Sequence, residues 1–314
     1  MLNTNIPLIP QRADPFIYKH TDGYYYFTAS IPAYDGIELR RATTLAGLAD
    51  ASRKIVWRKP DSGPYSDLVW APEIHFNQGA WYVYFAAAPS REIKDALFQH
   101  RMYAIKTEAA NPLEGDWQFC GQIETGIDSF CLDATTFTHH GRLYYLWAQK
   151  GPGIRGNSNL YIAEMDTPIR IKGKPVMLTK PELDWEIRGF WVNEGPAVIK
   201  GHGRVFISYS ASATDENYCL GLLWADENAD LLDPASWTKS SQPVFQTHAA
   251  LKMFGPGHNS FTQGENGEDV LVYHARQYTE IEGDPLWNPD RHTFIKTIKW
   301  DKDGMPDFGR PGQP

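Results

Sequence analysis

The sequence predicts an all-β fold, a five-bladed β-propeller. Five similar segments follow one another, each with an apolar strand, a glycine-containing turn and an aromatic strand, and no segment has a long, well-capped helical period. The polar residue near the start of each segment recurs at separations of 59, 60, 61 and 64, at Asp14, Glu73, Asp133, Glu194 and His258. Units too small to bury their own faces stack around an axis. The five polar residues would then converge on that axis.

The three strands of each unit can be assigned in chain order. They are expected at 13–18, 24–29 and 37–42; at 71–76, 81–86 and 102–107; at 132–137, 143–148 and 160–165; at 193–199, 205–210 and 220–225; and at 257–261, 270–274 and 293–300. We expect one domain over residues 1–314, with blades at roughly 12–60, 68–110, 130–175, 192–240 and 256–302.

The turns support this assignment. Asp22-Gly23 and Asn266-Gly267 separate apolar runs, and Asp-Gly or Asn-Gly at that place is a strong hairpin signal. A β-sandwich is the alternative fold, but its strands are not expected to recur in five units of this length. Four long loops with charged and aromatic residues are candidates for the walls of a pocket, at 89–100, 150–159, 180–191 and 277–291.

Composition excludes several classes of partner. The net charge is −8 and the pI about 5.7, and no basic run is present, which argues against nucleic acid and anionic membranes. Aromatic residues are 13% of the chain, enough to fill a β core and to leave a few for sugar faces. The possibility of a homo-oligomer is left open.

The expected location is the cytoplasm. Residues 1–12 have neither a basic start nor the apolar stretch of a signal peptide, and no apolar run reaches the ~20 residues of a membrane span. Three cysteines, Cys120, Cys131 and Cys219, lack metal-site spacing and are expected to be buried free thiols.

Glu194 is the candidate general acid. It lies between the aromatic pair Phe190-Trp191 and a Gly-Pro pair that begins an apolar run. Partial desolvation would raise its pKa and keep it protonated near neutral pH, as a general acid requires. A glutamate that caps a turn is the alternative interpretation.

Asp14 and Asp133 complete a set of carboxylates suited to glycoside hydrolysis, which needs an acid and a base. Asp14 precedes a proline that favours an extended backbone, and it is the candidate base. A negative charge on Asp133 would help to keep Glu194 protonated. Taken alone, Asp14 could start a turn and Asp133 could cap a strand; their matching phase in the repeats is the specific signal.

Three further residues have weaker signals. Glu73, within Trp70-Ala-Pro-Glu-Ile-His75, is a candidate for substrate contact or for an orienting or buried paired role. His258 follows Gly255-Pro-Gly257 and could be structural or could hold water or a hard cation at the axis, although nothing here has zinc-site spacing. Arg276 could donate to sugar hydroxyls or form a salt bridge.

The ordered set of motifs resembles glycoside hydrolase family 43, in particular its exo-acting α-L-arabinofuranosidases. The motifs span the chain in family order: Arg-Ala-Asp-Pro-Phe (12–16), Trp-Ala-Pro-Glu (70–73), Leu-Asp-Ala-Thr-Thr (132–136), Asn-Glu-Gly-Pro (193–196) and Gly-Pro-Gly-His-Asn-Ser (255–260). Related fructan-active families have Asn-Asp-Pro-Asn-Gly and Glu-Cys at two of these places, where this chain has Ala-Asp-Pro-Phe and Glu-Gly, so that alternative fits poorly.

This resemblance implies a five-bladed propeller and an inverting mechanism. Asp14 would be the general base, Glu194 the general acid and Asp133 the modulator of the pKa of the acid. His258 matches a position that in the family coordinates a central metal, often calcium, or a water; no cofactor is needed for the chemistry. The residues that match sugar-contacting positions, or are added as pocket aromatics, are Trp70, Arg276, Phe16, Tyr34 and Trp191.

The expected function is therefore a hydrolase of carbohydrate metabolism, an inverting exo-α-L-arabinofuranosidase acting on α-1,5-linked arabino-oligosaccharides from arabinan. A β-xylosidase or endo-arabinanase of the same family is the nearest alternative. The chain printed here stops after the fifth unit, whereas family β-xylosidases carry an extra β-sandwich, which weakens the xylosidase alternative. A catalytically silent sugar-binding propeller is the alternative from another class.

Overall fold

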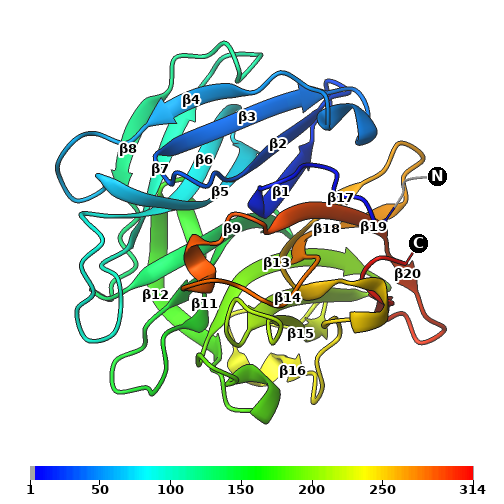
Figure 1. The fold of residues 1–314 in the computed structure, drawn as a ribbon. Coiled ribbons are helices and arrows are strands. Elements are labelled where there is room, and N and C mark those ends of the chain that lie inside the picture. Colours follow the sequence, from blue (N-terminus) through cyan, green and yellow to red (C-terminus); the bar gives the residue numbers. More distant parts are fainter. Residues whose placement is uncertain (1–3, 314) are drawn as a thin grey trace.

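Five antiparallel sheets surround a common axis in the computed structural model, and the first strand of each sheet lies nearest the centre (Figure 1). The structure describes residues 4–313. The prediction of a five-bladed β-propeller is confirmed. The helices described are 3-10 turns of three residues each: η1 (Ala46–Leu48), η2 (Asp184–Glu186), η3 (Pro234–Ser236), η4 (Ala249–Leu251) and η5 (Pro285–Trp287).

The strands follow one another outward in each blade. Blade one has β1 (Ala13–Lys19), β2 (Tyr25–Ser30), β3 (Gly36–Ala42) and β4 (Lys54–Arg58). Blade two has β5 (Asp67–Asn77), β6 (Ala80–Ala88), β7 (Arg101–Thr107) and β8 (Gln118–Gln122). Blade three has β9 (Cys131–His139), β10 (Arg142–Gln149), β11 (Asn159–Thr167) and β12 (Arg170–Thr179). Blade four has β13 (Asn193–Gly201), β14 (Arg204–Ala211), β15 (Cys219–Asp226) and β16 (Thr238–Lys239). Blade five has β17 (Phe254–Gln263), β18 (Asp269–Arg276) and β19 (His292–Thr297).

The predicted end of the second blade at residue 110 omits β8, which follows a loop of about ten residues and pairs with β7. A polar outer strand with little apolar alternation gives no periodic signal, and this explains the omission. Beyond the blades, β20 (Lys299–Trp300) pairs with β21 (Pro306–Asp307).

The two ends of the chain close the ring. Ile9 forms a bridge with Thr293 of β19, so a segment before the first blade adds to the outer side of the fifth. Thr4 donates from Oγ1 to the Gly312 carbonyl at 2.9 Å, so the described ends of the chain lie side by side. Closure of this kind satisfies a sheet edge that would otherwise be open.

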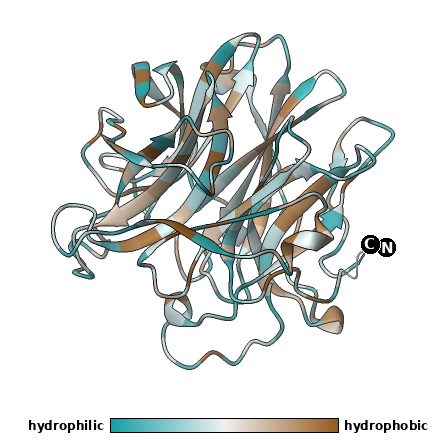
Figure 2. Ribbon diagram, turned by 90° about the horizontal axis from the view of Figure 1, so that it is seen from above, coloured by the Kyte–Doolittle hydropathy of each residue, from teal (hydrophilic) through white to brown (hydrophobic). Residues whose placement is uncertain are grey.

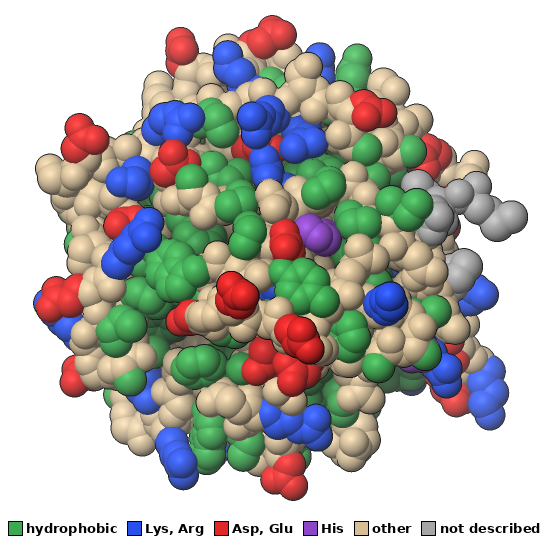
Figure 3. Space-filling view, viewed as in Figure 1, with side chains coloured by type: hydrophobic (Ala, Val, Ile, Leu, Met, Phe, Trp, Pro, Cys, Tyr) green, Lys and Arg blue, Asp and Glu red, His purple; other side chains and the backbone are tan. Residues whose placement is uncertain are grey.

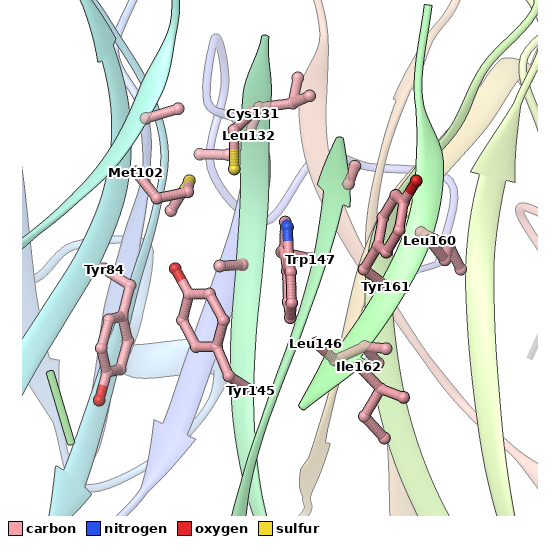
Figure 4. Packing of buried hydrophobic residues seen from close by; sticks show 14 of the residues in the cluster. Tyr84, Met102, Cys131, Leu132, Tyr145, Leu146, Trp147, Leu160, Tyr161 and Ile162 are labelled. Carbon is pink, nitrogen blue, oxygen red and sulfur yellow. The ribbon is translucent and has the colours of Figure 1, made fainter. Parts of the chain in front are cut away.

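Large aromatic side chains fill the space between blades. Figure 4 shows Tyr84 of the second blade facing Tyr145 of the third, with ring centroids 5.8 Å apart and edge-to-face geometry. Trp147 is fully buried beside Tyr161. In Figure 2 the hydrophobic colour is concentrated on the strands and the hydrophilic colour on the loops. Most of the aromatic residues therefore serve the core, as expected from composition.

Cys131 and Cys219 are buried free thiols, as predicted, and burial raises the pKa of Cys219 to about 12. Cys120 is free but only partly buried, which departs from the expectation. None of the helices among residues 4–313 has the length and hydropathy to cross a bilayer.

The innermost strands share a β-bulge at one register position. In each of them two residues are skipped between consecutive pairs with the second strand, and the first skipped residue has a positive φ. These residues are Asp14 (55°), Ala71 (43°), Asp133 (52°), Gly195 (52°) and His258 (42°). A left-handed non-glycine residue costs roughly 1–3 kcal/mol, and such strain is concentrated at functional sites. The bulge re-aims the side chain that it carries.

Candidate active site

A cavity of about 240 Å³ opens at the bulged ends of the innermost strands and receives side chains from all five blades. Asp14, Trp70, Asp133, Glu194 and His258 all line it. Figure 3 shows acidic, histidine and hydrophobic side chains grouped around the middle of this face. The convergence expected from the repeats therefore holds for Asp14, Asp133, Glu194 and His258.

The four long loops contribute to the walls, as expected. Ile93, Asn157, Phe190 and Leu286 line the cavity, one from each loop. Phe190 is 55% exposed and Ile93 is 59% exposed, so both are apolar residues open to solvent at the cavity. The cavity thus has a polar, charged floor and largely apolar walls.

Asp14 is buried and closely surrounded by donors. Ser30 donates from Oγ to Oδ2 at 2.6 Å, and Arg291 donates from Nη1 to Oδ1 at 3.4 Å. His258 Nδ1 lies 3.3 Å from the same Oδ1. Burial alone would raise the pKa of Asp14, but His258 and Arg291 outweigh it and hold the pKa below its ordinary value. Asp14 is therefore ionised at neutral pH, the state that a general base requires.

Glu194, the candidate acid, lines the same cavity as Asp14. Tyr218 donates from its hydroxyl to Oε1 at 2.7 Å. Burial raises the pKa of Glu194 to about 7, helped by the charge of Asp14 and opposed by the Tyr218 hydrogen bond and by Arg291. A carboxyl group that titrates near neutrality can donate a proton at working pH.

Asp133 is buried beside Glu194. It accepts at Oδ2 from the backbone N–H of Gly195 at 3.1 Å, so it holds the chain at the residue that follows the acid. Burial raises the pKa of Asp133, and repulsion from Glu194 and Asp14 raises it further. The protonation of Asp133 therefore depends on that of Glu194.

His258 packs its ring over Gly195, where a Cβ would lie 3.1 Å from the ring. Burial lowers its pKa, opposed by the charges of Asp14 and Glu73. Among residues 4–313 no three His, Cys, Asp or Glu side chains are placed to hold a metal ion. A hard cation prefers six or more oxygen ligands, and a lone imidazole does not fit that need. A metal at His258 therefore stays a prediction of the family resemblance.

Two predicted contact residues lie away from the cavity. Glu73 is buried against His75, Oε2 to Nε2 at 2.8 Å, which is the paired role considered for it. Phe16 packs on His75 at 4.7 Å between ring centroids and lines a different cavity, of about 420 Å³, farther along the innermost strands. Both residues follow the bulge by two positions, and this places them farther down the axis than Asp14. Neither residue lines the cavity that holds the carboxylates, and their contact with substrate stays a prediction.

Trp191 and Arg276 are also absent from the lining. Trp191 lies under the Arg155 guanidinium, 3.8 Å from its ring centroid. Arg276 is buried and donates to Asn288 Oδ1 and to the carbonyls of Thr214 and Pro285. Each of its three nitrogens donates to a loop that walls the cavity, so Arg276 braces these walls, and its direct contact with a sugar stays a prediction. Tyr34 and Trp70 line the cavity as predicted.

Three residues that sequence reasoning missed contact Asp14 or Glu194: Arg291, Tyr218 and His274. Arg291 lies at the end of a loop identified as a wall, and it bridges Asp14 to the Tyr34 hydroxyl, to which it donates at 2.9 Å. Tyr218 follows a polar loop and His274 is inside a strand, so neither had a motif signal. All three lie far from their carboxylates in sequence or outside the repeated motifs.

Residues 4–306 match the family described as Glycosyl hydrolases family 43. The chain belongs to this family. It is 55% identical over 306 residues to an extracellular exo-alpha-(1->5)-L-arabinofuranosidase of Streptomyces avermitilis, covering 97% of this chain and 63% of that protein. A protein of the same name from Streptomyces chartreusis is 49% identical over 280 residues, covering 89% of this chain and 84% of the relative. The solved alpha-L-arabinofuranosidase from Lactobacillus brevis superposes with a TM-score of 0.96 at 59% identity, covering 97% of this chain and 96% of that one. The chain thus spans less than two thirds of the length of the first of these relatives.

These relatives correct one expectation. Both Streptomyces proteins are named extracellular, so the prediction of a cytoplasmic protein is wrong. That prediction depended on the absence of a recognisable leader and on unpaired thiols. Two buried thiols are shielded from oxidants in any compartment, and they carry no information on location.

Proposed function

We propose that this family 43 glycoside hydrolase is an inverting exo-α-L-arabinofuranosidase that removes terminal arabinofuranose from α-1,5-linked arabino-oligosaccharides. The observation that carries the proposal is the pairing, in one cavity, of an ionised Asp14 with a Glu194 that titrates at about 7. The substrate class is supported by the arabinofuranosidase names of relatives at 49–59% identity.

The mechanism follows from these protonation states. Asp14 accepts a proton from a water molecule while the water oxygen bonds to the anomeric carbon. The bond from that carbon to the glycosidic oxygen breaks, its electron pair stays on the oxygen, and Glu194 protonates it. One step releases arabinose with inverted configuration. Asp133 and Gly195 orient Glu194, and Arg291 holds Asp14 in the ionised state.

The size of the cavity favours an exo mode. At about 240 Å³ it is smaller than the ~300–1,000 Å³ of typical ligand pockets, which suits one terminal sugar rather than a continuous chain. An endo-arabinanase needs an open groove that admits sugar residues on both sides of the cut. The chain's loops at 89–100 and 277–291 instead contribute Ile93 and Leu286 to the wall.

The product pattern from linear α-1,5-arabinohexaose tests the proposal. We expect arabinose and arabinopentaose from the first time point, because only the terminal unit enters the cavity. Products would be followed by chromatography, and the anomer first released by NMR. Fragments of two to four units at the start would indicate endo cleavage. Activity on xylo-oligosaccharides alone would indicate a β-xylosidase.

The pH profile gives a second test. We expect kcat/KM to be bell-shaped. It should fall as pH rises through about 7, because Glu194 loses the proton that it must donate. The acidic limb should lie below the ordinary range of an aspartate, because the pKa of Asp14 is lowered and protonation removes the base. An activity that rises from pH 7 to 9 would contradict these assignments.

A further inference from the structure

Two stacked rings lie between the proposed acid and the proposed base. Tyr218 and His274 have ring centroids 5.5 Å apart and planes within 4° of parallel. Each side chain is 1% exposed. Tyr218 donates to Glu194 Oε1 at 2.7 Å, and His274 Nδ1 accepts from the backbone N–H of Asp14 at 3.1 Å. One rigid stack therefore contacts both carboxylate residues.

The place of His274 in the propeller explains its bond to Asp14. His274 is opposite Gly257, just before the bulge of its blade, and Ser30 and Ser210 are at the same register position in theirs. Each of the three accepts, on its side chain, the bulge N–H of the next blade. For Ser30 the donor is Ala71, for Ser210 it is His258, and for His274 it is Asp14. A buried N–H without an acceptor costs ~1–3 kcal/mol, so these acceptors hold the bulges in place.

The same bond fixes the tautomer of His274. Because Nδ1 accepts an N–H, it carries no proton, and Nε2 carries the proton instead. Burial lowers the pKa of His274 to about 3, so the ring stays neutral over the working range. The distance of 3.3 Å between Nδ1 and Asp14 Oδ1 is therefore not an ion pair. The bond to the backbone N–H is the contact by which His274 holds the position of Asp14.

The glycines before His258 make room for this stack. A Cβ on Gly257 would lie 2.3 Å from Tyr218 Cδ1. On Gly255, which has a φ of +56°, it would lie 2.1 Å from the Asp215 carbonyl oxygen. No side chain at position 257 is compatible with Tyr218 where it stands. The two glycines of the Gly-Pro-Gly segment thus leave space for the Tyr218 ring and the Asp215 carbonyl, about 40 residues earlier in the sequence.

We propose that Tyr218 and His274 form a positioning pair that holds the acid Glu194 and the base Asp14 at a fixed separation across the cavity. The proposal rests on the proposed function. The pair transfers no proton. Tyr218 sets the direction in which Glu194 points, His274 sets the bulge that aims Asp14, and their parallel contact links the two. In an inverting hydrolase the separation of the carboxyl groups must leave room for one water, so this link has a direct chemical purpose.

Substitutions of Tyr218 and of His274 are expected to have different kinetic effects. The charged and titratable groups that face Glu194 are Tyr218, Asp14, Asp133 and Arg291. Tyr218→Phe keeps the ring and removes only the donor that favours the ionised acid. The alkaline limb of kcat/KM should move upward by about one pH unit. The loss of rate should be greater for oligosaccharides than for aryl arabinofuranosides, because it acts through the acid.

His274 variants should act through the base. We expect His274→Ala to lower kcat by roughly 10- to 100-fold, since small misplacements of reacting groups cost that much. The loss should be equal for oligosaccharide and aryl substrates, with the alkaline limb unmoved. His274→Asn should recover most of the rate, because its amide oxygen can replace Nδ1 as the acceptor of the Asp14 N–H.

Tyr273→Phe is the matched control. Its hydroxyl is also buried, but it accepts from the Gly312 N–H, away from the cavity, so the pH profile should not change. The proposal is overturned if Tyr218→Phe leaves the alkaline limb in place, or if His274→Asn is as slow as His274→Ala. A wild-type enzyme inactive on arabinosides would refute the proposed function instead. In that case the Glu194 titration, read by carboxyl ¹³C NMR in wild type and Tyr218→Phe, still decides the role of Tyr218.

Discussion

Replacing Glu194 with alanine is expected to slow the hydrolysis of α-1,5-arabino-oligosaccharides by roughly 10²–10⁴-fold, the usual contribution of a general acid. The same variant should retain far more of its activity on an aryl arabinofuranoside with an acidic phenol, because that leaving group departs without a proton. The measurement is kcat/KM for both substrates. The expectation depends on the burial that raises the pKa of Glu194 to about 7 and on the place of Glu194 in the same cavity as Asp14.

Glu216→Ala is a suitable control, since Glu216 is exposed and lies two residues from Tyr218 in sequence. It should match the wild type on both substrates. The alkaline limb should also disappear from the aryl profile of Glu194→Ala. Equal losses on the two substrates would remove Glu194 from the acid role.

The propeller was predictable because its signal is repeated. Hairpins with glycine-containing turns recur at nearly constant spacing, and the fourth strands that were not assigned, β4, β8, β12 and β16, do not alter the count of blades. The carboxylates were found for the same reason. Carboxylates that recur at equivalent positions of a repeat can be recognised from the sequence without any knowledge of three-dimensional contacts.

The position of each polar residue relative to the bulge could not be predicted. An alternation of polar and apolar residues along a strand does not reveal where a bulge lies. Asp14, Asp133 and His258 occupy the left-handed bulge position, whereas Glu194 precedes it by one residue and Glu73 follows it by two. A bulge leaves extra residues unpaired, so side chains before and after it face in directions that simple alternation does not give. Glu73 was therefore expected in the cavity and lies outside its lining.

The residues that contact the carboxylates could not be predicted from the sequence, for a different reason. Arg291 meets Asp14 across 277 residues of sequence, and His274 meets it across 260. Contacts of this length exist only once the last blade closes on the first. Arg276, the last residue of β18, was predicted to contact sugar hydroxyls, and its guanidinium donates to Asn288 and to the carbonyls of Thr214 and Pro285.

Asp14→Asn is expected to abolish most activity on both substrate types, by roughly 10²–10⁴-fold, because activation of water is needed whatever the leaving group. Asparagine is the informative replacement at this position. It tolerates the left-handed backbone at φ 55° that alanine would strain. It also keeps an oxygen that can accept from Ser30, which donates to Oδ2 at 2.6 Å.

The variant leaves the buried Arg291 without a charged partner, so a lower melting temperature is expected. Circular dichroism and thermal unfolding would establish that the protein is folded at the assay temperature. Retained turnover in the folded variant would remove Asp14 from the base role. A loss confined to oligosaccharides would instead mean that position 14 assists the leaving group, which its ionised state argues against. The comparison with Glu194→Ala is decisive, because only a base and an acid on opposite sides of the bond give equal losses in one variant and unequal losses in the other.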